Sequence, residues 1–304
     1  MKRIVFMMAV AVVVCGAARA CDVCGCAASS QYIGLLPNYN RNFIGLQQQF
    51  SDFSGNYPSA YIGKPDDQVR DRYNTFQLWG RYGIGQHYQV FAFVPYQYNN
   101  RNIDGAKTTN SGIGDVSFLV NRIIINDEHK KWNQSLTAGA GMKLPTGKYT
   151  DISIADNREL PNIQPGTGSW DFMTNANYTL KHNRAGVNID GSYTITTANK
   201  YSYKYGNRLN SGLACFYSFE LKKLSIIPQA GVRYEYALND YDNYSKKWLN
   251  EESGGYLLFA TAGAQVYYKR FGGRLTYQLP VSQHYGGGDI TAIKKMETSI
   301  FFLF

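Results

Sequence analysis

The sequence predicts an all-β fold: a transmembrane antiparallel β-barrel of about twelve strands with both termini on the periplasmic side. Three observations lead to this prediction: an N-terminal export signal, long segments in which apolar and polar residues alternate, and a last segment that ends in phenylalanine. The composition agrees with it, because 25 Tyr, 16 Phe and 30 Gly accompany only 17% charged residues. That mixture suits strands with one apolar face and aromatic belts.

The first twenty residues have the parts of a secretory signal peptide. Lys2 and Arg3 form a basic head, an apolar stretch follows at 4–15, and small residues end the segment at Ala20. The apolar stretch is shorter than the roughly 20 residues that a helix needs to span a bilayer. We therefore expect 1–20 to be a cleaved signal peptide, 21–40 a periplasmic or luminal N-terminal segment, and 41–304 a barrel in the bacterial outer membrane.

Alternation with a period of two is clearest at 134–144, 185–197 and 225–235. Each of these segments places apolar side chains on one face of a strand and polar side chains on the other. Their length matches a tilted membrane-crossing strand, and an even number of strands keeps both termini on one side. Strands are predicted at 42–52, 72–83, 87–98, 113–125, 132–144, 169–181, 184–197, 208–222, 224–237, 255–268, 273–282 and 292–304.

Short and long connections alternate between these predicted strands, as they do in outer-membrane barrels, where short turns face the periplasm and long loops face outward. The short turns are at 83–86, 126–131, 181–184, 222–223 and 269–272. The long loops are at 53–71, 99–112, 145–168, 198–207, 238–254 and 283–291.

The last segment places Phe304, Phe302 and Ile300 on one face and Ser299 and Glu297 on the other. A final strand that ends in an aromatic residue resembles the signal that the barrel-assembly machinery recognises. We therefore expect that machinery and outer-membrane lipid as partners.

Polar and charged residues on the inward parity predict a lumen of mixed charge. They either narrow the pore and favour polar solutes or hold the barrel together through ion pairs; Asp115 and Asp171 are expected to meet Lys143 or Arg233. Phe91, Phe93 and Phe259 share the inward parity and form either an apolar patch for a substrate or a contact with an N-terminal plug. The predicted lumen-lining residues are Arg81, Gln89, Asp115, Lys143, Asp171, Asp190, Glu220, Gln229, Arg233, Glu235, Arg274 and Glu297.

Cys21, Cys24 and Cys26 form a C-x-x-C-x-C cluster ahead of the first predicted strand. Closely spaced thiolates bind soft ions such as Cu(I) or Zn(II), and in an oxidising compartment two of them instead form a disulfide. Attachment of lipid to Cys21 is a third alternative. Cys215 lies on the lipid-facing parity, away from this cluster.

Nucleic-acid binding and enzyme activity find no support in the sequence. The net charge of +9 is scattered rather than gathered in a Lys/Arg run, so there is no electrostatic footprint for nucleic acid. The four histidines are dispersed, and the sequence contains no G-x-S-x-G, P-loop or H-E-x-x-H motif.

Three motifs resemble the outer-membrane transporter-like family named for the MetA pathway of phenol degradation: SGIGDVSFL at 111–119, AGAGMKLPTGKYT at 138–150 and QPGTGSWDF at 164–172. The resemblance implies a barrel that moves small, often hydrophobic compounds. We expect a non-enzymatic channel for passive passage of a small molecule or ion. The alternative is a barrel that anchors a metal-binding or redox-partner centre at the Cys cluster.

Overall fold

The computed structural model describes residues 41–57, 67–127, 131–150, 161–242, 246–250 and 253–304. None of the helices in these ranges has the length and apolar character needed to cross a membrane. The elements are β1 (Phe43–Tyr57), β2 (Asp67–Ile84), β3 (Tyr88–Ile103), β4 (Ala106–Ile113), β5 (Ser117–Asp127), β6 (Trp132–Lys143), η2 (Pro161–Ile163), β7 (Asp171–His182), β8 (Ala185–Thr196), β9 (Tyr203–Lys204), β10 (Arg208–Tyr217), β11 (Phe219–Leu221), β12 (Leu224–Ala237), β13 (Tyr241–Asp242), β14 (Lys247–Trp248), β15 (Gly255–Tyr268), β16 (Phe271–Tyr285), η3 (Gly286–Gly288) and β17 (Ile290–Leu303).

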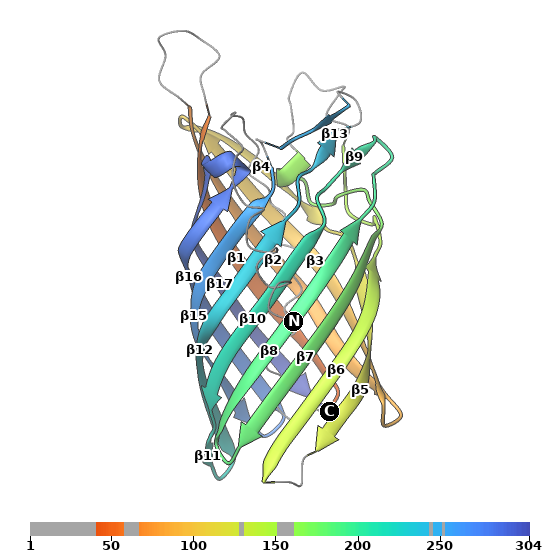
Figure 1. The fold of residues 1–304 in the computed structure, drawn as a ribbon, viewed down its shortest axis with the longest axis vertical. Helices are drawn as coiled ribbons and strands as arrows, with labels where there is room; N and C mark the ends of the chain where they lie inside the picture. Colours follow the sequence, from red (N-terminus) through yellow and green to blue (C-terminus); the bar gives the residue numbers. More distant parts are fainter. Residues whose placement is uncertain (1–40, 58–66, 128–130, 151–160, 243–245, 251–252) are drawn as a thin grey trace, which may run out of the picture.

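Twelve of these strands form a closed antiparallel barrel (Figure 1). Sequence neighbours pair around the ring, and the pairing of β17 with β1 closes it, from Phe43 opposite Leu303 to Gly55 opposite Ile290. The predicted fold class is confirmed. The order around the ring is β1, β2, β3, β5, β6, β7, β8, β10, β12, β15, β16 and β17.

Alternating residues of each barrel strand face the interior and the lipid. On β3, Phe91 and Phe93 are each only 1% exposed, whereas Val94 and Tyr96 are 40% and 46% exposed. A two-residue period places successive side chains on opposite faces of a strand. The alternation visible in the sequence therefore separates an outer, lipid-facing surface from an interior.

The two ends of the barrel carry different connections (Figure 1). At the lower end, which we call the turn end, β7, β11 and β15 turn directly into their neighbours through Asn183, Lys222 and Lys269, each with a positive φ. The start of β1 and the end of β17 also lie there, because Phe302 of β17 pairs with Phe271 beside the Lys269 turn and Leu303 pairs with Phe43. The opposite end, which carries the longer connections, is the loop end.

One long loop expected from the sequence, at 99–112, is instead a hairpin. β3 continues to Ile103 and pairs with β4 through a turn at Asp104 and Gly105, whose φ angles are 46° and 93°. A two-residue hairpin turn of this kind requires positive φ at both positions, which Asp-Gly supplies. The hairpin was missed because strands that rise above the apolar band are polar on both faces and show no alternation.

Other predicted loops are also shorter than expected or contain secondary structure. β1 and β2 extend into the predicted loop 53–71, and β16 and β17 are joined by η3. The connections at 198–207 and 238–254 contribute β9, β13 and β14, which form a small separate sheet. These segments therefore lengthen the barrel wall or add a small sheet at the loop end (Figure 1).

The outward face of β3 and β4 allows a direct test of the membrane position. Lysine in place of Val94 would place a charge in the middle of the apolar band, at a cost of about 2–4 kcal/mol. Lysine in place of Ser111, which is exposed and paired with Tyr98 near the loop end, should cost at most about 1 kcal/mol. Denaturant unfolding in phospholipid vesicles measures both, and equal costs would contradict the placement.

Candidate functional site

The interior of the barrel is the candidate site, because most of the predicted lumen-lining residues lie there. Asp190 is half-buried on β8, and Glu220 is exposed. The remaining ten are buried: Arg81, Gln89, Asp115, Lys143, Asp171, Gln229, Arg233, Glu235, Arg274 and Glu297.

Glu220 differs from the expectation that it lines the lumen. Its side chain is 66% exposed and lies 3.7 Å from Lys181. It follows the inward parity, but it belongs to β11 beside the turn at Lys222. The odd or even position of a residue in a strand tells which face it is on, but not how far along the barrel axis it lies. Glu220 is therefore on the inward side of its strand but at the turn-end rim, where it is exposed to solvent.

Asp115 is the centre of a junction that joins the three family motifs. Its Oδ1 accepts a hydrogen bond from the backbone N–H of Gly147 at 2.9 Å. Its Oδ2 accepts from the N–H and the hydroxyl of Thr167 at 2.9 and 2.7 Å. Residues from the start of β5, the end of β6 and the approach to β7 are thereby held together at the loop end.

Lys143 lies between two carboxylates in this junction. Its Nζ is 2.6 Å from Asp171 and 3.2 Å from Asp115, and it donates to Thr167 Oγ1 at 2.5 Å. Ser169 donates to the other oxygen of Asp171 at 2.9 Å. The expected contact of Asp115 and Asp171 with Lys143 is present, and Arg233 belongs to another group. We call Asp115, Lys143, Gly147, Gly166, Thr167, Ser169 and Asp171 the motif junction.

Two glycines let the backbone segments of the motif junction approach one another closely. A Cβ placed on Gly166 would lie 2.6 Å from the carbonyl carbon of Gly147, and one on Gly147 would lie 2.7 Å from Gly166 Cα. Such distances are below any ordinary contact, and the obstructing atoms are backbone. The Gly residues of the two motifs are therefore required by packing between the segments.

A second group of charges crosses the barrel interior on β8, β12 and β17. Arg233 lies 3.6 Å from Asp190 and 3.8 Å from Glu235, and Glu235 lies 2.5 Å from Lys295. Arg274 pairs with Glu297 on the neighbouring strand. Lys295 was not among the predicted residues, although it shares the inward parity of Glu297, because its partner is 60 residues away in sequence.

A third buried ion pair, Arg101 with Asp71, was also missed. Arg101 Nη2 and Nε lie 2.6 and 2.8 Å from the two carboxylate oxygens, and both side chains are at most 3% exposed. Both residues belong to segments that the sequence predicts as loops. The extension of β2 and β3 above the apolar band brings them together.

A group of buried apolar side chains lies inside the barrel near the turn end. Phe43 packs edge-on against Trp79 at 4.6 Å between ring centroids, and Trp79 and Phe93 are stacked at 6.2 Å. The guanidinium of Arg81 lies 5.4 Å from the centre of the Phe43 ring. We call this group the turn-end cluster: Phe43, Trp79, Phe91, Phe93, Leu119, Met173, Phe216, Ile227, Tyr267, Phe301 and Leu303.

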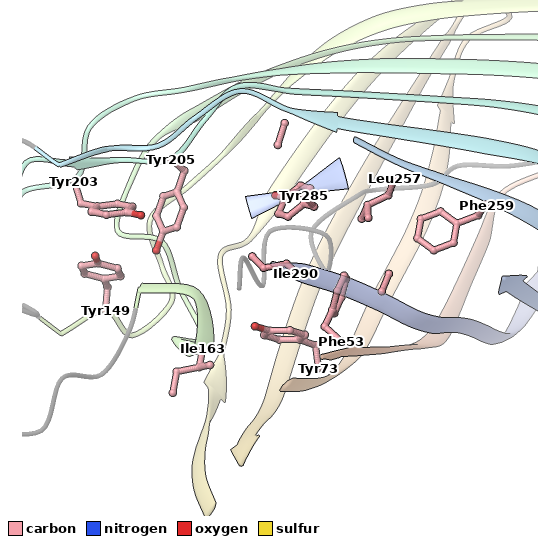
Figure 2. Close-up of a cluster of buried hydrophobic side chains, with 12 residues drawn as sticks. Phe53, Tyr73, Tyr149, Ile163, Tyr203, Tyr205, Leu257, Phe259, Tyr285 and Ile290 are labelled. Carbon is pink, nitrogen blue, oxygen red and sulfur yellow. The ribbon is translucent and has the colours of Figure 1, made fainter. Parts of the chain in front are cut away.

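A second apolar group, the loop-end cluster, combines barrel wall and loop residues (Figure 2). Asn99 donates to the carbonyl of Ile163 at 3.1 Å, and Tyr203 donates to Asp240 at 2.7 Å, so side-chain hydrogen bonds hold these loop segments in place. The wall provides Phe53, Tyr73, Ala237, Leu257, Phe259, Tyr285, Ile290 and Ala292, and the loops provide Tyr149, Ile163, Tyr203 and Tyr205.

An open cavity of about 570 Å³ lies at the turn end, between β2, β3 and β5. Arg41, Arg81, His87 and Gln89 give it a polar lining beside the turn-end cluster. Arg81 donates to the carbonyl of Arg41 at 3.1 Å through Nε. The cavity is large enough for a small organic molecule.

The predicted metal ligands Cys21, Cys24 and Cys26 lie outside the described residues. Within the described ranges no group of three or more His, Cys, Asp or Glu side chains is arranged to hold a metal ion. Cys215 is a free, exposed cysteine on the outer face.

Loss of one partner from the buried Arg101–Asp71 pair should destabilise the barrel strongly. Arg101→Met leaves the Asp71 carboxylate buried and uncompensated, which costs about 3–5 kcal/mol. Lys181→Met, at the exposed pair with Glu220, should cost no more than about 1 kcal/mol. Urea unfolding followed by heat-modifiable gel mobility compares the two, and a similar small loss for both variants would contradict the importance of burial.

The glycine contact of the motif junction predicts a different stability effect. Gly166→Ala forces backbone atoms apart and should lower the unfolding free energy by about 1–3 kcal/mol. Gly191→Ala is a matched control, because its Cβ would meet nothing nearer than 3.9 Å. Thermal unfolding in detergent measures the difference; equal stability of the two variants would show that the close approach at Gly166 is relaxed in solution.

Comparisons with known proteins agree with the motifs and the fold. An outer-membrane channel from Pseudomonas putida F1 shares the fold with a TM-score of 0.64 at 13% identity, covering 89% of this chain and all of that one. The β domain of the Bordetella autotransporter BrkA gives 0.50 at 9% identity, covering 86% and 99%. Identities this low show a shared fold alone. No curated protein matches the sequence.

The sequence model of the family described as "Putative MetA-pathway of phenol degradation" matches residues 67–243, more than half of the chain. This range contains all three motifs that meet at the motif junction. The chain is therefore a member of that family, with the barrel fold of bacterial outer-membrane proteins.

Proposed function

We propose that the protein is an outer-membrane channel through which small, predominantly apolar molecules pass by diffusion, without chemical change. The observation that carries the proposal is the turn-end cluster: buried apolar side chains on the inward parity of a membrane barrel. A water-filled porin has a polar interior. Aromatic and aliphatic side chains inside the wall instead favour a solute with apolar surface.

The energetic advantage for such a solute is substantial. Contact with an apolar wall removes solute surface from water at about 25 cal/mol per Å². A ring-sized molecule that buries roughly 100 Å² therefore gains about 2.5 kcal/mol at each apolar cluster. The two clusters at opposite ends provide such contacts near both entrances to the barrel.

The charged groups of the barrel interior support the same proposal. Lys143, Arg233 and Lys295 each lie within ion-pair distance of at least one carboxylate, as do Arg101 and Arg274. Charges paired in this way neutralise one another and create little net field along the lumen. They therefore do not favour a free ion of either sign, and they hold strands together as buried networks do.

The sequence also leaves open passage of a metal ion, or a metal-binding or redox-partner centre built on the Cys cluster. Cys21, Cys24 and Cys26 lie outside the described residues, and the described residues contain no group of three or more His, Cys, Asp or Glu side chains that could hold a metal ion. The apolar interior favours the solute channel.

Exchange of Phe93 for leucine or glutamine tests the proposal. The probe is N-phenyl-1-naphthylamine, whose fluorescence rises when it enters the membranes of Gram-negative cells. The wild-type protein should accelerate its uptake over cells with an empty vector. Phe93→Leu keeps an apolar wall and should retain most of this rate. Phe93→Gln introduces a polar side chain of about the size of leucine and should reduce the rate several-fold.

Liposome swelling with arabinose is the control for a nonspecific pore. Phe93→Gln should not lower arabinose flux, because the substitution makes the wall more polar. Uptake of the apolar probe no faster than in vector cells, or equal loss in the Leu and Gln variants, would refute an apolar path through the lumen.

A further inference from the structure

A group of basic side chains lies on the outer wall, where β17, β1 and β2 approach the loop end. On β2 the outward face carries Leu78 and Phe76, 44% and 48% exposed, and then changes to Arg72 and Arg70. On β17 the outward face likewise changes from an apolar residue, Ile300, to a basic one, Lys294. The basic residues therefore lie just beyond the apolar band, at the height of the lipid headgroups.

These basic side chains surround one carboxylate, Asp52 of β1. Asp52 is directly opposite Arg72 on β2 and Lys294 on β17. Arg70 binds it with two hydrogen bonds, Nε to Oδ1 at 3.0 Å and Nη2 to Oδ2 at 2.8 Å, and Arg72 Nε lies 3.8 Å from Oδ1. We call Arg70, Arg72, Lys294 and Asp52 the outer basic patch.

The carboxylate of the patch is buried, whereas its two guanidinium groups are about half exposed. The Asp52 side chain is 2% exposed, whereas those of Arg70 and Arg72 are 48% and 51% exposed. The carboxylate thus lies beneath the guanidinium groups and orients them on the wall. Because these long side chains are already held, a ligand loses less conformational entropy when it binds them.

The patch keeps a surplus of positive charge. Three cations share one carboxylate, and Asp52 uses two of the five N–H donors of Arg70. Lys294 Nζ lies 5.9 Å from the centre of the Phe50 ring, so its cation lies beside an apolar residue of the wall. Guanidinium groups match the geometry of phosphate, and a nearby ammonium adds a point charge.

We propose that the outer basic patch binds a phosphate group of lipid A, the phosphorylated glycolipid of the outer leaflet. The apolar outer residues below the patch contact the acyl chains of the same lipid. Such a site fixes the height of the barrel in an asymmetric membrane. It is separate from the lumen and goes beyond the proposed channel function.

Binding of purified lipid A tests this site. The delipidated full-length protein in detergent is titrated with bisphosphorylated lipid A, with the dephosphorylated lipid and with inorganic phosphate. The double variant Arg72→Gln/Lys294→Gln leaves the Arg70–Asp52 hydrogen bonds in place. Lys246→Gln/Lys247→Gln, which removes two exposed lysines at β14, is matched to it in charge.

The patch variant should bind bisphosphorylated lipid A about five- to thirtyfold more weakly at low salt, with a smaller difference at high salt. The β14 variant should bind like wild type. Equal affinity for the dephosphorylated lipid, or unchanged binding by the patch variant, would overturn the proposal. Displacement of the lipid by an equal concentration of inorganic phosphate would show a site for free phosphate instead.

Heat-modifiable gel mobility shows whether each variant folds. If the double variant does not fold, Lys294→Gln alone carries the test, with Lys247→Gln as its control. Apolar-solute uptake is measured separately, so failure of the channel proposal and failure of the lipid site are distinguishable.

Discussion

The pairing of β1 with β17 is the contact on which the rest of the structure depends. Hydrocarbon provides no partner for backbone N–H and C=O groups, so strands can cross it only as a closed ring. The two ends of the described barrel meet along most of β1, from Phe43 to Gly55. That closure fixes which residues face lipid and which face the interior, and it creates the enclosed space in which the charged and apolar groups lie.

The interior contains both buried charges and buried apolar side chains, and the two have different requirements. Buried charges require partners, and the three ion-pair groups provide them. Buried apolar side chains need no partners but leave a wall that water wets poorly. The interior therefore combines paired charges with two apolar clusters, which suits the proposed path for molecules that interact weakly with charge and favourably with aromatic rings.

The family motifs have a structural role in this arrangement. Asp115, Lys143 and Thr167 come from separate motifs, and their hydrogen bonds fasten the connection between β6 and β7 to the start of β5. The same connection supplies Tyr149 and Ile163 to the loop-end cluster. The motifs therefore shape the loop-end mouth of the barrel.

Much of the fold could be predicted from the sequence, because a strand with one face in lipid must alternate. Alternation disappears from the sequence where a strand leaves the lipid. Above the apolar band both faces are polar, so the β3–β4 hairpin and the Arg101–Asp71 pair were not recognised. Alternation also gives no height along the barrel, which explains Glu220. It cannot tell which inward charges meet across the barrel, so Lys295 was overlooked as the partner of Glu235.

The closed ring can be tested most directly by a disulfide between its first and last strands. Gln47 and Ser299 are opposite each other across the β1–β17 pair. With the native cysteines replaced by serine, Gln47→Cys/Ser299→Cys should oxidise readily and change the unreduced gel mobility, because adjacent strands bring the Cα atoms within disulfide range. Gln48→Cys/Ser299→Cys, on opposite faces, should not. Efficient cross-linking of the second pair alone, or of neither, would contradict the closed barrel and its register.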